Sequence, residues 1–165
     1  MNWNSIAPNQ YELKDGFQTL ATMHLSTKGA VCHTAQRTLR IRRQGFWKST
    51  LEMTDSNGQF ILRVEPVRWY GSQYRFVLNT IPYRLEIQNR PLAHFVITQD
   101  GKDVLSYGLK AKGARVVADI HATALLPEAF SLELHALSWF LFQPIAKGET
   151  GEDSMSTSDI FLTLT

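Results

Sequence analysis

A chain of 165 residues with 44% hydrophobic and 19% charged residues has the composition of one globular domain, neither disordered nor fibrous. Its formal net charge of +2 is too small to attract the whole molecule to a polyanion, so nucleic acid is not an expected partner. The single cysteine, Cys32, excludes an internal disulfide and a cysteine-based metal site.

Residues 1–16 are predicted to form an N-terminal arm. They lack a basic region followed by an apolar run, so no signal peptide is expected. A reducing compartment suits a chain with one cysteine, and we therefore expect a cytoplasmic protein.

Residues 17–124 are predicted to form the strands of a barrel. Apolar residues alternate with polar ones, and turn signals arrive about every 8–12 residues, as in an antiparallel meander. Asp100-Gly101 is one such turn, between two of the strands. The candidate strands are 17–25, 36–42, 46–55, 59–66, 74–79, 83–88, 93–99, 103–109 and 114–124. Nine or more strands in one domain must close into a barrel or fold into a sandwich to avoid exposed edges. With the helix described below, the predicted fold class is mainly β, a closed antiparallel barrel of about 10–12 strands around a central hydrophobic helix.

The dipeptide Asn57-Gly58 predicts a two-residue type I′ hairpin, in which both central residues have positive φ. That register sets Met53 opposite Leu62 on an apolar face. On the polar face it sets Glu52 opposite Arg63, a favourable pair of opposite charges.

The preceding hairpin is predicted to turn through a three-residue loop, Arg43-Gln44-Gly45, with the glycine in the left-handed region. Ile41 then faces Trp47, and Arg40 lies opposite Lys48 on the outer face. A two-residue loop is disfavoured because it would set Lys48 among the apolar residues.

A hydrophobic helix is predicted over residues 127–143. Pro127 suits a first helical turn, Glu128 complements the helix dipole, and Pro144 is expected to end the helix. Residues 146–158 are polar and small, typical of a flexible connection, and 159–165 are predicted to add an edge strand.

This helix is predicted to lie in the core of the barrel. A transmembrane span needs about 20 apolar residues, whereas this segment is shorter and contains Glu133 and His135. A surface helix should have a polar face. Here the apolar residues go right round the axis: Phe130, Leu132, Leu134, Leu137, Trp139, Phe140, Leu141 and Phe142.

Two stretches resemble the tubby C-terminal-like superfamily, which includes the plant LURP-one-related proteins and the phospholipid scramblases. TLRIRRQGFWKSTLEMTDSNGQFILRV is similar to that superfamily's strand-turn-strand with an Asp-x-x-Gly turn, here Asp55 to Gly58. LLPEAFSLELHALSWFLFQ resembles its central helix. The resemblance covers roughly Phe17 to Gln143. It implies a barrel closed around a hydrophobic helix, and phosphoinositide binding through basic outer residues.

Scramblase activity is not implied by this resemblance. The chain lacks the proline-rich N-terminal region, the cysteine cluster and the C-terminal membrane segment of scramblases, and no acidic loop resembles their proposed calcium site. About twenty residues also follow the predicted helix, whereas the superfamily usually ends at or soon after it.

The strongest candidate site is a run of basic residues with no acid between them: Arg37, Arg40, Arg42, Arg43 and Lys48. As an anion site it would take a phosphoinositide or an anionic membrane surface, with about 1 kcal/mol per basic residue. The alternative is a solvated outer face that acids such as Glu52, Glu65 or Glu86 neutralise.

No catalytic or metal-binding set is predicted. The five histidines are scattered, and Cys32-His33 falls in a predicted loop without the spacing of a nucleophilic or metal site. No cofactor motif occurs, so we expect a non-enzymatic binding or scaffold domain and no cofactor. The second hypothesis is a lipocalin-like barrel with an apolar ligand, which requires a helix outside the barrel.

Overall fold

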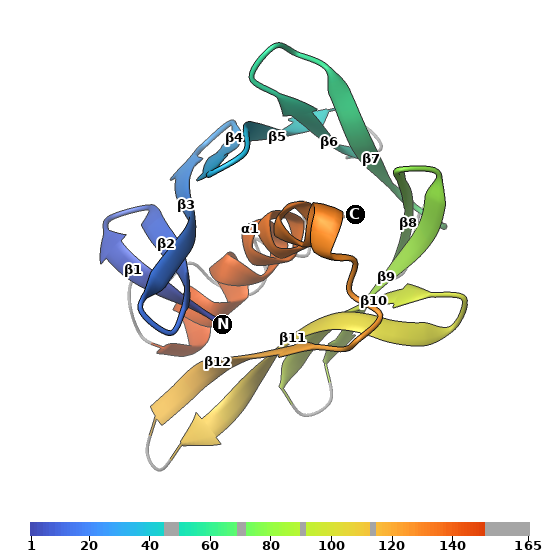
Figure 1. Ribbon diagram of the computed structural model, residues 1–165. Coiled ribbons are helices and arrows are strands. Elements are labelled where there is room, and N and C mark those ends of the chain that lie inside the picture. The colour runs from blue at the N-terminus through green and yellow to red at the C-terminus, as the bar shows by residue number, and fades with distance from the viewer. Residues whose placement is uncertain (45–49, 69–71, 90–91, 113–114, 151–165) are drawn as a thin grey trace.

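Twelve strands form one antiparallel sheet in which each strand pairs with the next along the chain. The computed structural model describes residues 1–44, 50–68, 72–89, 92–112 and 115–150. The strands are β1 (Asn2–Ala7), β2 (Gln10–Asp15), β3 (Gln18–Ser26), β4 (Gly29–Thr34), β5 (Thr38–Gln44), β6 (Thr50–Asp55), β7 (Phe60–Pro66), β8 (Gln73–Leu78), β9 (Ile81–Asn89), β10 (Ala93–Gln99), β11 (Lys102–Lys112) and β12 (Arg115–Ala122). The sheet curls into a nearly closed barrel around the C-terminal helix (Figure 1). The predicted fold class is therefore confirmed.

Three strands were not predicted. Residues 1–16 are not an arm, because they form β1 and β2 and bury Trp3, Tyr11 and Leu13 in the core. β4 was assigned to a turn and a loop because its inward residues, Ala30 and Cys32, are small and give little hydrophobic signal. β1 lies beside β12 at the seam, where the described residues form no ladder.

The predicted register of β6 and β7 is confirmed, although the turn that joins them differs. Met53 lies opposite Leu62, and Arg63 donates to a Glu52 carboxylate oxygen at 2.8 Å. Only Gly58 of this turn has positive φ, so it is not type I′, and β7 carries a bulge beside the turn. The Asp55 carboxylate accepts hydrogen bonds from two backbone amides of the turn, which favours this conformation.

The predicted three-residue loop at 43–45 is wrong. Arg43 and Gln44 continue β5, Ile41 pairs with Met53, and Arg40 pairs with Thr54. The longer ladder sets Arg42 opposite Glu52, which favours it over the predicted register. Residues 45–49 lie outside the described residues.

The two-residue turn at Asp100-Gly101 is confirmed. Both residues have positive φ, and Gln99 pairs directly with Lys102 across the turn.

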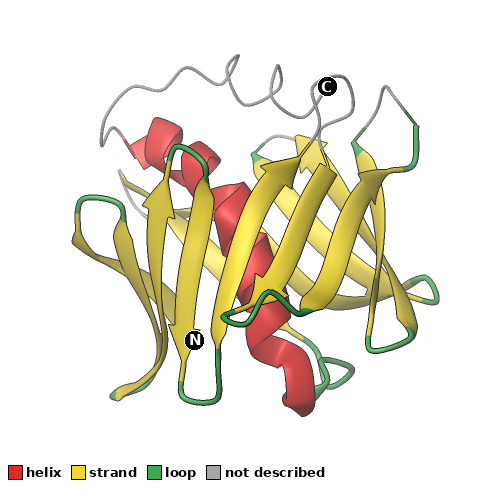
Figure 2. Ribbon diagram, turned by 90° about the horizontal axis from the view of Figure 1, so that it is seen from above, coloured by secondary structure: helices red, strands yellow, loops and turns green. Residues whose placement is uncertain are grey.

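The helix lies in the core, as predicted, but its bounds differ. A short 3-10 helix (Glu128–Phe130) precedes α1 (Ser131–Thr150), which crosses the barrel from one end to the other (Figure 2). Every residue from Glu133 to Gln143 is buried. None of the described helices is long and apolar enough to cross a membrane.

Pro144 does not end the helix. Proline removes one backbone hydrogen bond from the helix interior, but burial of Ile145 and Ala146 beyond it offsets that loss. Residues 146–150, predicted to be a flexible connection, are therefore helical. Residues 151–158 and the predicted edge strand at 159–165 lie outside the described residues.

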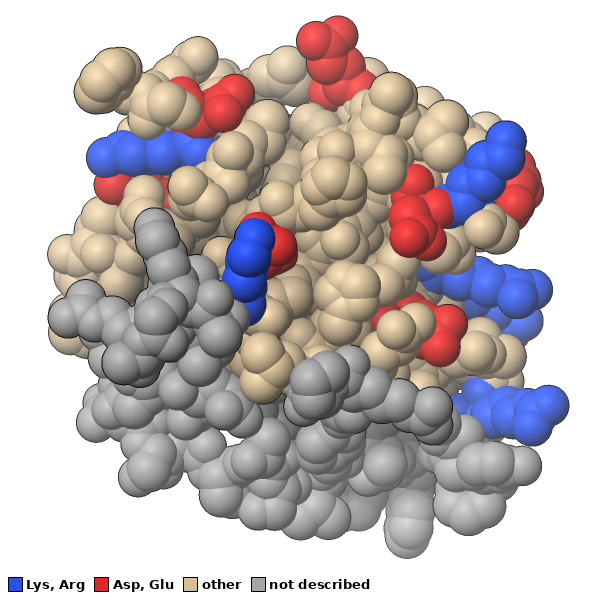
Figure 3. Space-filling view, turned by 90° about the horizontal axis from the view of Figure 1, so that it is seen from below, with Lys and Arg blue, Asp and Glu red and all other residues tan. Residues whose placement is uncertain are grey.

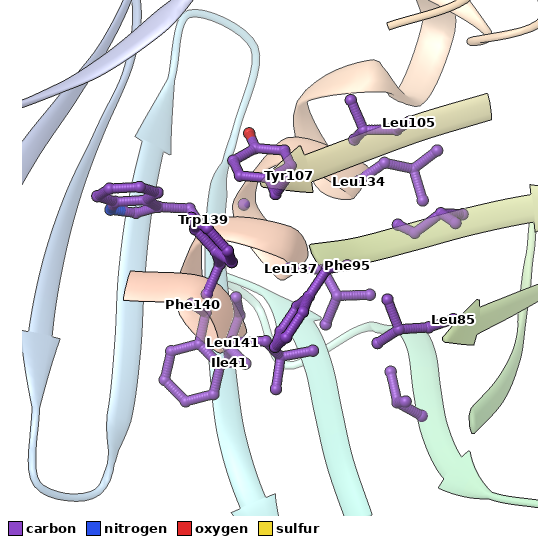
Figure 4. Close-up of a cluster of buried hydrophobic side chains, with 14 of the residues drawn as sticks. Ile41, Leu85, Phe95, Leu105, Tyr107, Leu134, Leu137, Trp139, Phe140 and Leu141 are labelled. Carbon is purple, nitrogen blue, oxygen red and sulfur yellow. The ribbon is translucent and has the colours of Figure 1, made fainter. Parts of the chain in front are cut away.

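Aromatic side chains of α1 join distant strands inside the barrel. Trp139 stacks on Trp3 of β1 with ring centroids 5.5 Å apart, and Phe142 meets Phe95 of β10 edge to face at the same distance. Figure 4 shows Trp139 and Phe95 packed with Leu137 among residues of β5, β9 and β11. The helix thus occupies the barrel interior.

Candidate functional site

Two residues of the predicted basic run, Arg40 and Arg42, share the outer face of β5. Leu39 and Ile41 alternate with them and point inward, with 0% and 1% of their surface exposed. We call Arg40 and Arg42 the outer pair. Both are exposed, and neither forms an ion pair with another described residue.

Acidic neighbours neutralise this face only in part. Glu52 lies opposite Arg42, but one of its carboxylate oxygens accepts from Arg63 and the other from Gln44, at 2.8 and 3.1 Å. Glu65 lies on β7 and is 3.6 Å from Arg75 of β8. The outer pair therefore keeps an excess of positive charge.

Arg37 belongs to a different part of the molecule. It lies in the turn between β4 and β5 and forms an ion pair with Glu133, a buried residue of the first turn of α1. The two residues are 96 positions apart in the chain, so no local pattern could reveal the pair. Arg37 is a structural residue that ties the start of the helix to the barrel.

Replacing Arg37 with alanine is expected to lower the free energy of unfolding by about 1–3 kcal/mol, because it leaves the Glu133 carboxylate buried without its partner. The loss stays below that for a fully buried pair because 40% of the Arg37 side chain is exposed. Arg40→Ala is the matched control and should change stability by less than about 0.5 kcal/mol. Urea denaturation of both variants measures the difference, and equal losses would contradict the structural role of Arg37.

Arg43 points into the barrel. Its guanidinium carbon lies 5.7 Å from the centroid of the Phe140 ring, a cation–π contact with the helix. Burial lowers the pKa of Arg43 and raises that of Tyr74, which lies close to it. Alternation from Leu39 and Ile41 would have identified this inward position if β5 had been extended through Gln44.

Of the four predicted residues that the structure describes, it brings only Arg40 and Arg42 together. Lys48, which was expected opposite Arg40, lies outside the described residues. The register of β5 and β6 gives Arg40 the neighbour Thr54 instead.

The barrel interior contains a chain of hydrogen bonds between three side chains. Trp3 Nε1 donates to the Tyr107 hydroxyl at 3.0 Å, and that hydroxyl lies 2.7 Å from His135 Nδ1. Burial lowers the pKa of His135 to about 4, and the positive N-terminus adds to this, so the ring is neutral at pH 7. A neutral ring carries one proton, so the donor of this hydrogen bond depends on which ring nitrogen holds it.

Cys32 and His33 do not form a catalytic pair. They are consecutive residues of β4 and point to opposite faces, Cys32 into the core and His33 to solvent, where it bonds Thr38 at 3.0 Å. Burial, reinforced by the charge of Glu133, raises the pKa of the Cys32 thiol to about 12. Within the described part of the chain, no three His, Cys, Asp or Glu residues lie close enough to hold a metal ion.

A hollow of about 1230 Å³ on the outer face of β7 to β11 was not anticipated from the sequence. Val96 forms part of it, although only 5% of its surface is exposed. The charged residues that line the hollow have both signs: Arg63, Arg75, Arg84, Glu65, Glu86, Asp100 and Asp103. Because the signs are mixed, this hollow selects no single charge of ligand. Only pairing across four hairpins assembles it, which explains why local patterns missed it.

Comparison with protein-family models, with curated proteins and with solved structures found no match to this chain.

Proposed function

We propose that this chain is a non-enzymatic, tubby-like or LURP-one-like binding or scaffold domain that recognises an anionic lipid or phosphoinositide headgroup. The observation that carries the proposal is the outer pair, two exposed arginines on one face of β5. Residues two apart on a strand are about 7 Å from each other, close enough for both guanidiniums to contact one phosphorylated headgroup. Binding of this kind would hold the protein at the cytoplasmic side of a membrane as a peripheral protein.

The architecture supports this proposal over a lipocalin-like carrier. A carrier barrel needs an interior cavity for its apolar ligand. Here α1 occupies the barrel interior, and the residues from Glu133 to Gln143 are buried. The helix inside the barrel is also the feature that the resemblance to the tubby C-terminal-like superfamily implies.

Liposome sedimentation tests the proposed function. Wild-type protein is expected to bind vesicles that contain a phosphoinositide, and Arg40→Ala/Arg42→Ala is expected to bind roughly 30-fold more weakly, since each basic residue contributes about 1 kcal/mol. The matched control is Arg75→Ala/Arg84→Ala, which removes two arginines from another part of the outer face. The proposal would be refuted if the wild-type protein did not bind these vesicles at low salt, or if both double variants lost the same amount of vesicle binding.

A further inference from the structure

The seam of the barrel, where β1 lies beside β12, is not closed by backbone hydrogen bonds. Every other pair of neighbouring strands forms an antiparallel ladder, but the described residues of β1 and β12 form none. No ion pair between described residues joins these two strands either. Figure 3 views the molecule from the side on which β12 lies, and the middle of that face carries mostly uncharged side chains. Packing behind the seam must therefore keep the barrel closed there.

Trp3 is the residue of β1 that reaches the interior. The other residues of β1 are exposed or partly exposed, whereas only 8% of the Trp3 surface is accessible. Its indole stacks on that of Trp139 in α1, with the ring planes 8° apart, and its Nε1 donates to the Tyr107 hydroxyl of β11. In the described part of the chain, no other residue of β1 makes a side-chain hydrogen bond, ion pair or ring contact. One side chain thus joins β1 to the helix and to β11.

The neighbouring strand, β2, is anchored independently of β1. Tyr11 and Leu13 of β2 have only 4% and 0% of their surface exposed. The Tyr11 hydroxyl accepts a hydrogen bond from Gln143 Nε2 at 2.8 Å, and its ring meets Trp139 edge to face at 5.3 Å. β2 can therefore stay on the helix when β1 leaves.

The remaining attachments of β1 are weak. Its ladder with β2 shifts register between Ser5 and Ala7, which leaves Ile6 unpaired in a β-bulge with 52% of its surface exposed. The N-terminal ammonium lies 3.5 Å from an Asp15 carboxylate oxygen, but both groups are partly exposed, and such pairs add little stability. A buried aromatic side chain contributes more than either attachment, so Trp3 decides whether β1 stays in place.

We infer that β1 is a detachable strap that closes the barrel at the seam, and that Trp3 is its latch. The inference goes beyond the proposed function and does not depend on an anionic ligand. Detachment peels β1 from β2 and withdraws Trp3 from Trp139 and Tyr107, while α1 and the other strands stay folded. Such an opening requires less free energy than global unfolding because it exposes much less buried surface.

Polar groups behind Trp3 lower the cost of opening. Trp139 Nε1 and His135 Nε2 are buried and have no hydrogen-bond partner among the described residues. An unpaired buried polar group destabilises the closed barrel. Trp139 stacks directly on Trp3, and His135 is one hydrogen bond beyond it through the Tyr107 hydroxyl. Water that enters at an opened seam can bond these groups, which offsets part of the loss of Trp3 burial.

Native-state hydrogen exchange of the full chain, followed by NMR, tests the inference. In wild type, the β1 amides that bond β2 are expected to exchange faster than the β5–β7 amides. Their rates should also depend less on low concentrations of urea, because a local opening exposes less surface. Trp3→Phe keeps an aromatic ring against Trp139 but removes the donor to Tyr107, and it should raise the exchange rates of these β1 amides roughly 10-fold.

Leu62→Ala is the matched control, because it removes a fully buried side chain from β7, on a part of the ring of strands away from the seam (Figure 1). It should raise the exchange rates of the β5–β7 amides by about 30-fold or more and leave those of the β1 amides within about twofold of wild type. The strap is overturned if the wild-type β1 and β5–β7 amides share one rate and one urea dependence, or if Leu62→Ala speeds both sets equally. If Trp3→Phe leaves the β1 rates unchanged, Trp3 is not the latch and the inference fails.

Discussion

Replacing Leu137 with aspartate is expected to abolish cooperative folding. Leu137 lies in the middle of α1 with 0% of its surface exposed and packs within a cluster of buried hydrophobic side chains (Figure 4). Truncation to alanine at such a site costs about 2–5 kcal/mol, and a buried carboxylate without a partner adds a desolvation cost of several kcal/mol. Together these approach or exceed the total stability of a typical domain.

Near-ultraviolet circular dichroism and a thermal melt check this result. The control is Leu125→Asp, in the exposed segment before the 3-10 helix, where 47% of the leucine surface is accessible. It should fold and melt within about 0.5 kcal/mol of wild type. A Leu137→Asp protein with wild-type near-ultraviolet signal would show that α1 does not occupy the barrel interior.

The free energy of unfolding is expected to fall by about 3 kcal/mol as the pH drops from about 6.5 to about 4, because of His135. Its pKa is lowered to about 4 in the folded chain, against 6.5 as its ordinary value. The unfolded state therefore takes up a proton first, and stability is lost through this range and levels off below it. In the protonated ring both nitrogens carry hydrogen, so Nδ1 can then only donate to the Tyr107 hydroxyl.

Urea denaturation at closely spaced pH values measures this effect. A plot of the free energy of unfolding against pH has a slope to which His135 and the carboxylates contribute. In His135→Gln the contribution of the histidine should disappear, and the contribution of the carboxylates should remain. His121→Gln removes an exposed histidine of β12 and should keep the wild-type slope. Parallel pH profiles for wild type and His135→Gln would contradict burial of a neutral His135.

Two sequence patterns, the alternation along strands and the apolar residues all round the helix, gave correct predictions because each depends only on residues near in sequence. Alternation predicts which residues of a strand share a face, and it placed Met53, Leu62, Glu52 and Arg63 correctly. Apolar residues all round a helix require burial on all sides, whatever surrounds it. Where the local signal was weak the prediction failed, as in β4, whose inward residues are small.

The candidate site depended on contacts that no local pattern contains. Arg37 is set apart from the basic run by an ion pair with Glu133, which forms only when the helix enters the barrel. Arg43 points into the barrel, away from the outer pair, because β5 continues through Gln44. Pairing with β6 and the contact with Phe140 decide that length. Among the described residues of the run, only Arg40 and Arg42 share a face, because strand alternation alone decides it.

The end of the barrel at which each connection lies could be assigned only with the full topology. In a meander, every second connection lies at the same end, so the end of a residue depends on how many strands precede it. A prediction that misses β4 assigns every later connection to the opposite end of the barrel. The sequence by itself thus determined a barrel with a buried helix, through local periodicity. The tertiary structure decided which charges face one another, because that depends on counting and pairing all twelve strands.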